Sequence, residues 1–80
     1  MYKLLLVDDE ASIRQLLRMT LEMDGFEVIE ATDGLEALKV YEKELPDVVL
    51  LDVKLPLMNG IEVLERLRKI NPDAEVIMIS

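Results

Sequence analysis

The stretch VVLLDVKLPLMNG, residues 48–60, carries the clearest indication of the fold. Its first four residues are apolar on both faces, which is typical of a strand buried between two layers. Pro56 then marks a loop, and Asn59 followed by Glu62 has the pattern of an N-cap with an acidic residue three positions later. The stretch therefore predicts a buried strand, a loop and the beginning of a helix.

The same alternation of short apolar strands and amphipathic helices extends along the rest of the chain. Strands are predicted over residues 3–7, 26–30, 48–51 and 75–79, with helices over 11–24, from the cap at Asp33 to before Pro46, and from 59 onward. Residues 26–30 are expected to form an edge strand, and the inner face of the second helix is expected to carry Leu35, Leu38 and Tyr41. The methionines are expected to fill gaps in the core: Met19, Met23, Met58 and Met78.

Four strands separated by three helices predict an α/β protein with a parallel sheet, right-handed crossovers and helices on the faces of the sheet. In such sheets ligands bind outside the carboxyl ends of the strands, where the strand order reverses. The residues that follow directly on the strands are therefore the first candidates for a functional site.

The composition excludes several functional classes. The formal net charge is −8 and the pI is about 4.4, so the surface repels phosphate backbones and anionic lipid, and direct contact with nucleic acid or membrane is not expected. The chain has no His and no Cys, which excludes disulfides, His general bases and Cys/His zinc sites. No apolar run exceeds four residues, so neither a transmembrane span nor a signal peptide is expected, and a cytoplasmic location is the default.

Carboxylates stand at the ends of two predicted strands. Asp8 and Asp9 follow the first strand and Asp52 follows the third, so the three converge if those strands are neighbours. Close like charges favour a hard cation such as Mg²⁺, and Asp52, alone at its strand end, is the better candidate nucleophile. The alternative is that the acids merely end strands and cap the next helix. Ser80, at the end of the fourth strand, is a candidate hydroxyl donor or simply a terminal polar residue.

Three segments together resemble the receiver domain of two-component response regulators: VDDE at 7–10, LLDVKLPLMNG at 50–60 and VIMIS at 76–80. Their order, spacing and strand contexts also match, both for single-domain phosphorelay receivers and for receivers at the head of transcription regulators. The resemblance extends over all 80 residues, which correspond to about the first two-thirds of such a domain. It implies a flavodoxin-like fold and signal transduction through a Mg²⁺-dependent phosphoacceptor, not a turnover enzyme.

The resemblance also implies a role for each candidate residue. Asp52 matches the aspartate that takes a phosphoryl group from a histidine kinase or phosphotransfer protein, and Asp8 and Asp9 match the acidic pair that holds Mg²⁺. Lys54 stands where the family supplies a metal ligand through its backbone carbonyl. Ser80 matches the hydroxyl that senses the bound phosphoryl group.

The sequence departs from the family pattern at its end. Receivers continue with a helix, a strand bearing an essential Lys and a last helix, so residues 1–80 are expected to form an incomplete receiver domain with impaired activity. Residues 76–79 are apolar on both faces, which suits an interior strand. A symmetric dimer built on this bare flank is therefore expected. Two other interpretations remain open, a self-associating fragment that no longer switches and, with less support, a phosphohydrolase.

Overall fold

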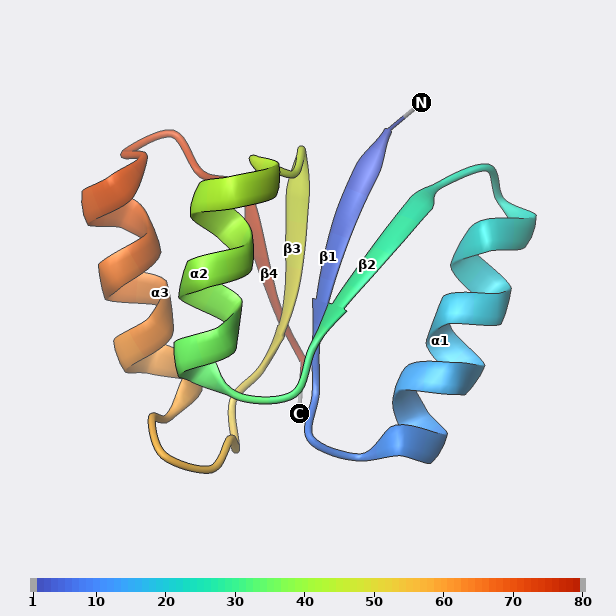
Figure 1. The fold of residues 1–80 in the computed structure, drawn as a ribbon, viewed down its shortest axis with the longest axis horizontal. Coiled ribbons are helices and arrows are strands. Elements are labelled where there is room, and N and C mark those ends of the chain that lie inside the picture. Colours follow the sequence, from blue (N-terminus) through green and yellow to red (C-terminus); the bar gives the residue numbers. More distant parts are fainter. Residues whose placement is uncertain (1, 80) are drawn as a thin grey trace.

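Strands and helices alternate along the computed structural model, which describes residues 2–79 (Figure 1). The elements are β1 (Lys3–Val7), α1 (Ala11–Met23), β2 (Glu27–Ala31), α2 (Gly34–Glu44), β3 (Val48–Asp52), α3 (Gly60–Ile70) and β4 (Val76–Ile79). Each predicted element is present, with ends shifted by at most about one or two residues. None of the helices in residues 2–79 has the length and apolar character needed to cross a membrane.

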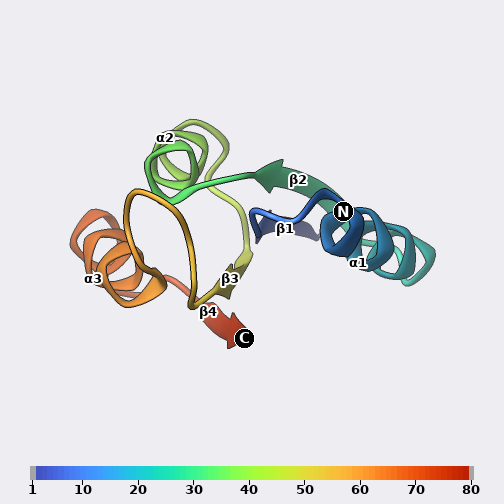
Figure 2. The same cartoon turned by 90° about the horizontal axis from the view of Figure 1, so that it is seen from below.

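All neighbouring strands are parallel, in the order β2-β1-β3-β4. The first strand, β1, therefore lies between β2 and β3. The sheet is extended on one side of β1 by β2 and on the other side by β3 and β4, and ligands usually bind where the strand order reverses in this way. Figure 2 shows α1 on one side of the sheet and α2 with α3 on the other. The prediction that residues 26–30 form an edge strand is confirmed, since β2 pairs only with β1 among the described residues.

The central strands are apolar throughout because both of their faces are covered. Leu4 and Leu6 of β1 lie on the side of α1, and Leu5 and Val7 lie on the side of α2 and α3. The larger cluster is completed by fully or nearly fully buried residues of the other elements: Ala31, Ala37, Tyr41, Val49, Leu51, Met58, Val63, Leu67 and Ala74. Most of the core thus lies between the sheet and the α2–α3 pair.

Local hydrogen bonds begin two of the helices as the sequence predicts. The Asp33 carboxylate accepts a hydrogen bond from the Glu36 N–H at 2.8 Å, and the Asn59 side-chain oxygen accepts one from the Glu62 N–H at 3.0 Å. Glu36 also reaches back, but to the N–H of Thr32 and not to that of the cap residue. These bonds satisfy backbone donors that an uncapped helix would leave free.

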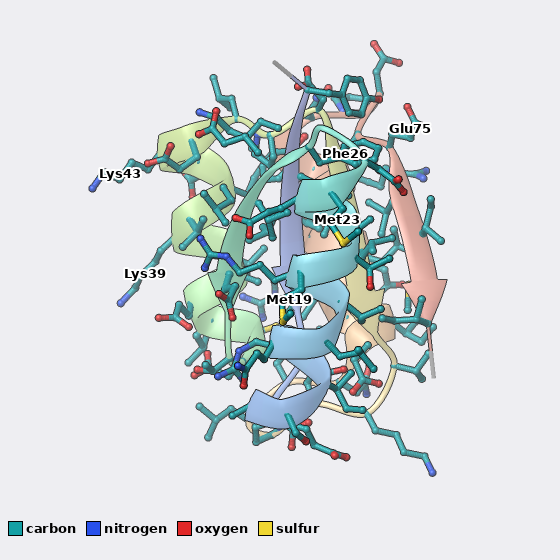
Figure 3. All side chains as sticks on the ribbon, turned by 90° about the vertical axis from the view of Figure 1, so that its right-hand side faces the viewer. Met19, Met23, Phe26, Lys39, Lys43 and Glu75 are labelled. Atoms are coloured by element: carbon teal, nitrogen blue, oxygen red, sulfur yellow. The ribbon has the colours of Figure 1, made fainter. Side chains whose placement is uncertain are left out.

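Several expected core positions lie at the surface instead. Leu35 is 46% exposed, because the small residues Gly34 and Ala37 face the core and bring α2 close to its neighbours. The expected burial of Met19 and Met23 is also wrong, since they are 57% and 86% exposed on α1 (Figure 3). The other two methionines do contact the core. One face of α1 is therefore apolar but uncovered by residues 2–79.

Candidate functional site

Three carboxylates meet at the carboxyl edge of the sheet, which is the edge that Figure 2 faces. Val7 and Leu51 are register partners in the β1–β3 pair. Asp8 and Asp52 are the residues that follow them along the two strands, so they lie side by side. Asp9 follows in the same turn. One carboxylate oxygen from each of the three lies within 4.8 Å of the others. The expected convergence is confirmed, and it depends on β1 and β3 being neighbours.

The three acids differ in how firmly they are held. Asp8 is only 5% exposed, its N–H donates to the carbonyl of Ala31 at 3.2 Å, and its carboxylate accepts from the Glu10 N–H at 2.9 Å. Asp9 is exposed. Asp52 is half-buried, and its carboxylate accepts a hydrogen bond from the Lys54 N–H at 3.0 Å. Asp8 is thus held in place, whereas one carboxylate oxygen of Asp52 accepts no hydrogen bond from residues 2–79.

Helix capping does not account for this cluster. Glu10 occupies the N-cap position of α1, and no side-chain cap bond forms there among the described residues. The carboxylate of Asp8 closes a local turn with Glu10, and the carboxylate of Asp52 closes one with Lys54. Neither Asp52 nor Asp9 caps a helix, so the simpler explanation of acids that begin helices is not supported.

The residues present fit a hard divalent cation. Three like charges within 4.8 Å repel one another unless a cation or a proton offsets them, and carboxylate oxygens are the ligands that Mg²⁺ takes in proteins. Lys54 directs its N–H to Asp52 and is exposed, and ligation by its carbonyl stays a prediction. Ser80 lies outside the described residues.

Arg14 supports the turn that carries Asp8, and sequence reasoning missed it. Its guanidinium donates to the Asp8 carbonyl at 2.8 Å and to the Glu30 carboxylate at 3.0 Å, and Glu30 also pairs with Arg18. Burial alone would raise the pKa of Glu30, but hydrogen bonds from Arg18 and Arg14 prevail and lower it. The sequence signal that could have indicated this role is the pair of arginines one helical turn apart, Arg14 and Arg18, followed by the acidic Glu30 in the next strand.

The loop from β3 to α3 lies beside Asp52 and is closed by its own hydrogen bonds. The Gly60 N–H donates to the Val53 carbonyl at 2.9 Å, and the Met58 N–H donates to the Pro56 carbonyl at 2.7 Å. The second bond spans only Leu57, which has a positive φ of 71°. Sequence reasoning missed this conformation, because a leucine gives no local indication of it.

The architecture and the position of the carboxylates define the class of protein. The strand order is that of flavodoxin-like α/β folds, with acidic residues at the switch between β1 and β3. The family model described as "Response regulator receiver domain" matches residues 4–80, so the chain belongs to the receiver domain family of two-component signal transduction.

Relatives and solved structures agree with this assignment. Sporulation initiation phosphotransferase F of Bacillus subtilis is 44% identical over 98% of this chain and 63% of its own length. The probable transcriptional regulator ycf27 of Guillardia theta is 46% identical, and the match extends over 98% of this chain but only 30% of that protein. The response regulator TrrA of Thermotoga maritima, solved in complex with Mg(2+)-BeF, is 41% identical with a TM-score of 0.95, over 98% of this chain and 68% of that one. The chain thus spans less than two-thirds of these curated relatives.

Proposed function

We propose that this chain accepts a phosphoryl group on Asp52 from the phosphohistidine of a histidine kinase or phosphotransfer protein. The observation that carries the proposal is the convergence of Asp8, Asp9 and Asp52 within 4.8 Å at the carboxyl edge of the sheet. In the transfer, an oxygen of Asp52 forms a bond to phosphorus while the P–N bond of the donor breaks. The electron pair of that bond returns to the imidazole nitrogen, and the proton on the other ring nitrogen keeps the leaving imidazole neutral.

The surroundings of the three acids favour Asp52 as the acceptor. Asp8 is nearly fully buried and its carboxylate already accepts a hydrogen bond, so its approach to a donor is restricted. Asp52 is half-buried at the end of a central strand, and the Lys54 N–H fixes one of its oxygens. The backbone therefore orients the carboxylate, and the attacking atom is its second oxygen, which accepts no hydrogen bond from residues 2–79.

Mg²⁺ is part of the proposal. Asp8, Asp9 and Asp52 would hold the ion, with the backbone carbonyl of Lys54 as a further ligand. Bound there, Mg²⁺ supplies positive charge that offsets the carboxylates and the phosphoryl oxygens. Ser80 is proposed to contribute a hydroxyl that senses the phosphoryl group. The complex of TrrA with Mg(2+)-BeF and its complex with the histidine kinase ThkA support the ion and the class of donor.

The chain acts in this proposal as an acceptor and not as a turnover enzyme. A shallow groove over β2 is lined by Arg18, Val28, Ile29, Glu30, Val40, Lys43 and Glu44, and none of the three carboxylates belongs to its lining. The proposed acceptor chemistry therefore does not use this groove.

Mass spectrometry of the intact chain tests the acceptor role. After incubation with Mg²⁺ and acetyl phosphate, the wild type should gain one hydroxylamine-labile phosphoryl group, and Asp52→Asn should gain none. Asp47→Asn is a matched control, because Asp47 is an aspartate at the amino ends of the strands, where it accepts a hydrogen bond from the Lys3 N–H. This substitution should leave the labelling intact. Labelling of Asp52→Asn, or no labelling of a wild type that is folded by circular dichroism, would contradict the proposal.

A second candidate is self-association through β4. Within residues 2–79, β4 is the other edge strand of the sheet, and Ile77 in its middle is 51% exposed. A symmetric dimer would cover this flank. The accessible surface of 4924 Å² is nevertheless close to the ~4,900 Å² typical of a compact 9.2 kDa monomer, so the total area by itself does not favour a dimer. Sedimentation equilibrium that shows only monomer at high concentration would exclude this candidate.

A further inference from the structure

Both backbone groups of Asp8 are held by hydrogen bonds that lead to the edge strand β2. The Asp8 N–H donates to the Ala31 carbonyl at 3.2 Å. The Asp8 carbonyl accepts a hydrogen bond at 2.8 Å from Nη1 of Arg14, and Nε of the same guanidinium donates at 3.0 Å to the Glu30 carboxylate. Since Glu30 and Ala31 are the last two residues of β2, this strand anchors Asp8 through both of its backbone groups.

Pairing with Glu30 alone does not explain the position of Arg14. Arg18, one turn further along α1, also pairs with the Glu30 carboxylate. The side chain of Arg14 is only 15% exposed, whereas that of Arg18 is 43% exposed. Arg14 is thus mostly buried, and it directs one of its nitrogens to a backbone carbonyl that carries no formal charge. The hydrogen bond to the Asp8 carbonyl is what distinguishes Arg14 from Arg18.

The carbonyl that Arg14 contacts belongs to the peptide bond between Asp8 and Asp9. Because a peptide unit is planar, a guanidinium that fixes this oxygen also fixes the direction in which the chain continues to Asp9. The Asp8 carboxylate is held by the Glu10 N–H at 2.9 Å, but Asp9 is exposed. The orientation of this peptide unit therefore bears on the positions of two of the three carboxylates that converge at the edge of the sheet.

We infer that Arg14 is a positioning residue for the proposed metal site. It orients the Asp8–Asp9 peptide unit so that both carboxylates lie beside Asp52. Ligands that are oriented in advance bind more tightly, because less conformational freedom is lost on binding. The inference rests on the proposed Mg²⁺-dependent acceptor function. In this role Arg14 acts through the backbone of Asp8, and it contacts neither the ion nor the phosphoryl group.

Electrostatics alone predicts the opposite effect of Arg14 on the metal. A guanidinium near the carboxylates repels a divalent cation, so removal of its charge should strengthen Mg²⁺ binding. Removal of a group that orients a metal ligand instead weakens metal binding, by about 10- to 100-fold. The sign of the change in the Mg²⁺ dissociation constant therefore separates positioning from simple charge balance.

Calorimetric titration of the whole chain with Mg²⁺ measures this constant without any phosphoryl transfer. Arg14→Met keeps an unbranched stem of similar length but removes both hydrogen bonds and the charge, and it should raise the dissociation constant about tenfold. Arg14→Lys keeps the charge, but one ammonium does not reproduce the planar fork that reaches two acceptors. It should therefore raise the constant by about the same factor.

Arg18→Met is the matched control. It removes a guanidinium from the same helix that pairs with the same carboxylate, but the hydrogen bonds of Arg18 lead to Glu30 and Glu22 and not to the backbone of a proposed metal ligand. Because this exposed charge is screened by solvent and salt, Arg18→Met should keep the dissociation constant within about twofold of the wild type. All variants are compared at a temperature at which thermal melts show them folded. A purely structural bond would lower the melting temperature and leave the dissociation constant of the folded chain unchanged.

A dissociation constant in Arg14→Met that equals the wild-type value or lies below it would overturn the inference. A wild-type constant in Arg14→Lys would overturn it as well, and so would an equal loss of affinity in Arg14→Met and Arg18→Met. If Arg14→Met does not fold, Arg14→Lys decides by the same criterion. A wild type that binds no Mg²⁺ would refute the metal site and the proposed function with it, so the two failures are distinguishable.

Discussion

Gly60→Ala should displace α3 from the strand that carries Asp52. A Cβ at this position would lie 2.4 Å from the Asp52 carbonyl oxygen and 2.8 Å from the Val53 Cα, whereas ordinary contacts begin near 3.4 Å. The helix start must therefore retreat by about 1 Å. Both obstacles are backbone atoms, one in the last residue of β3 and one in the residue after it, so neither can turn aside as a side chain would.

The magnitude follows from two losses and one gain. Overpacking of this kind costs about 1–3 kcal/mol, and a shift of about 1 Å also breaks the 2.9 Å hydrogen bond from Gly60 to Val53, worth about 1 kcal/mol. Alanine regains up to about 1 kcal/mol of helix propensity. The free energy of unfolding should therefore fall by about 1–3 kcal/mol, which lowers the melting temperature by several degrees.

Urea unfolding followed by circular dichroism measures this loss, and Gly34→Ala provides the comparison. There the nearest atom is the Val63 Cγ2 at 2.7 Å, and the next is the Met58 Cβ at 3.0 Å, both in side chains. Gly34→Ala should thus be the milder variant. The labelling rate of folded Gly60→Ala with acetyl phosphate should also fall, because the loop beside Asp52 moves. A Gly60→Ala chain as stable as the wild type, or less affected than Gly34→Ala, would refute the steric reasoning.

Three other perturbations have defined outcomes. Glu30→Gln should lower the free energy of unfolding by about 1 kcal/mol at neutral pH. Arg18 and Arg14 lower the pKa of folded Glu30, so the stabilisation by its carboxylate is present above the unfolded value of 4.5 and is lost as the pH falls through the lower folded value. Urea titrations of the variant and the wild type should therefore converge in acid. Asn59→Ala should lower the unfolding free energy by about 1 kcal/mol through loss of its cap, and Asn59→Asp should not, as thermal melts would show. Mg²⁺ at ten times its dissociation constant should stabilise the wild type by about 1.4 kcal/mol and Asp8→Asn by much less. Calorimetry measures this difference, and an equal effect on both proteins would argue against a metal site at Asp8.

Local signals in the sequence were sufficient for the order and type of the elements. The caps at Asp33 and Asn59 were predicted because an N-cap depends on atoms a few residues apart. The strands were predicted because a segment covered on both faces is apolar throughout. Since chain order alone puts acids at the ends of two strands, Asp8, Asp9 and Asp52 were also found without the structure.

Burial was predicted less well, because it depends on what packs across from a residue. Leu35 continues the apolar stripe of its helix, yet Ala37 is the residue that faces the core. Met19 and Met23 lie on a face of α1 that no other element of residues 2–79 covers. The spacing of hydrophobic residues limits which faces of a helix can be buried. It does not decide between neighbouring faces when a small residue lets the helix pack closer to the sheet.

The sequence by itself determined the succession of strands and helices and the acids at their ends, since these follow from interactions between near neighbours in the chain. Only the tertiary structure decided that β1 lies beside β3, which brings Asp52 to Asp8 across 44 positions of sequence. It alone decided the strained turn at Leu57, since Leu55 and Met58 must both reach the core. Both depend on long-range packing, which local propensities do not encode.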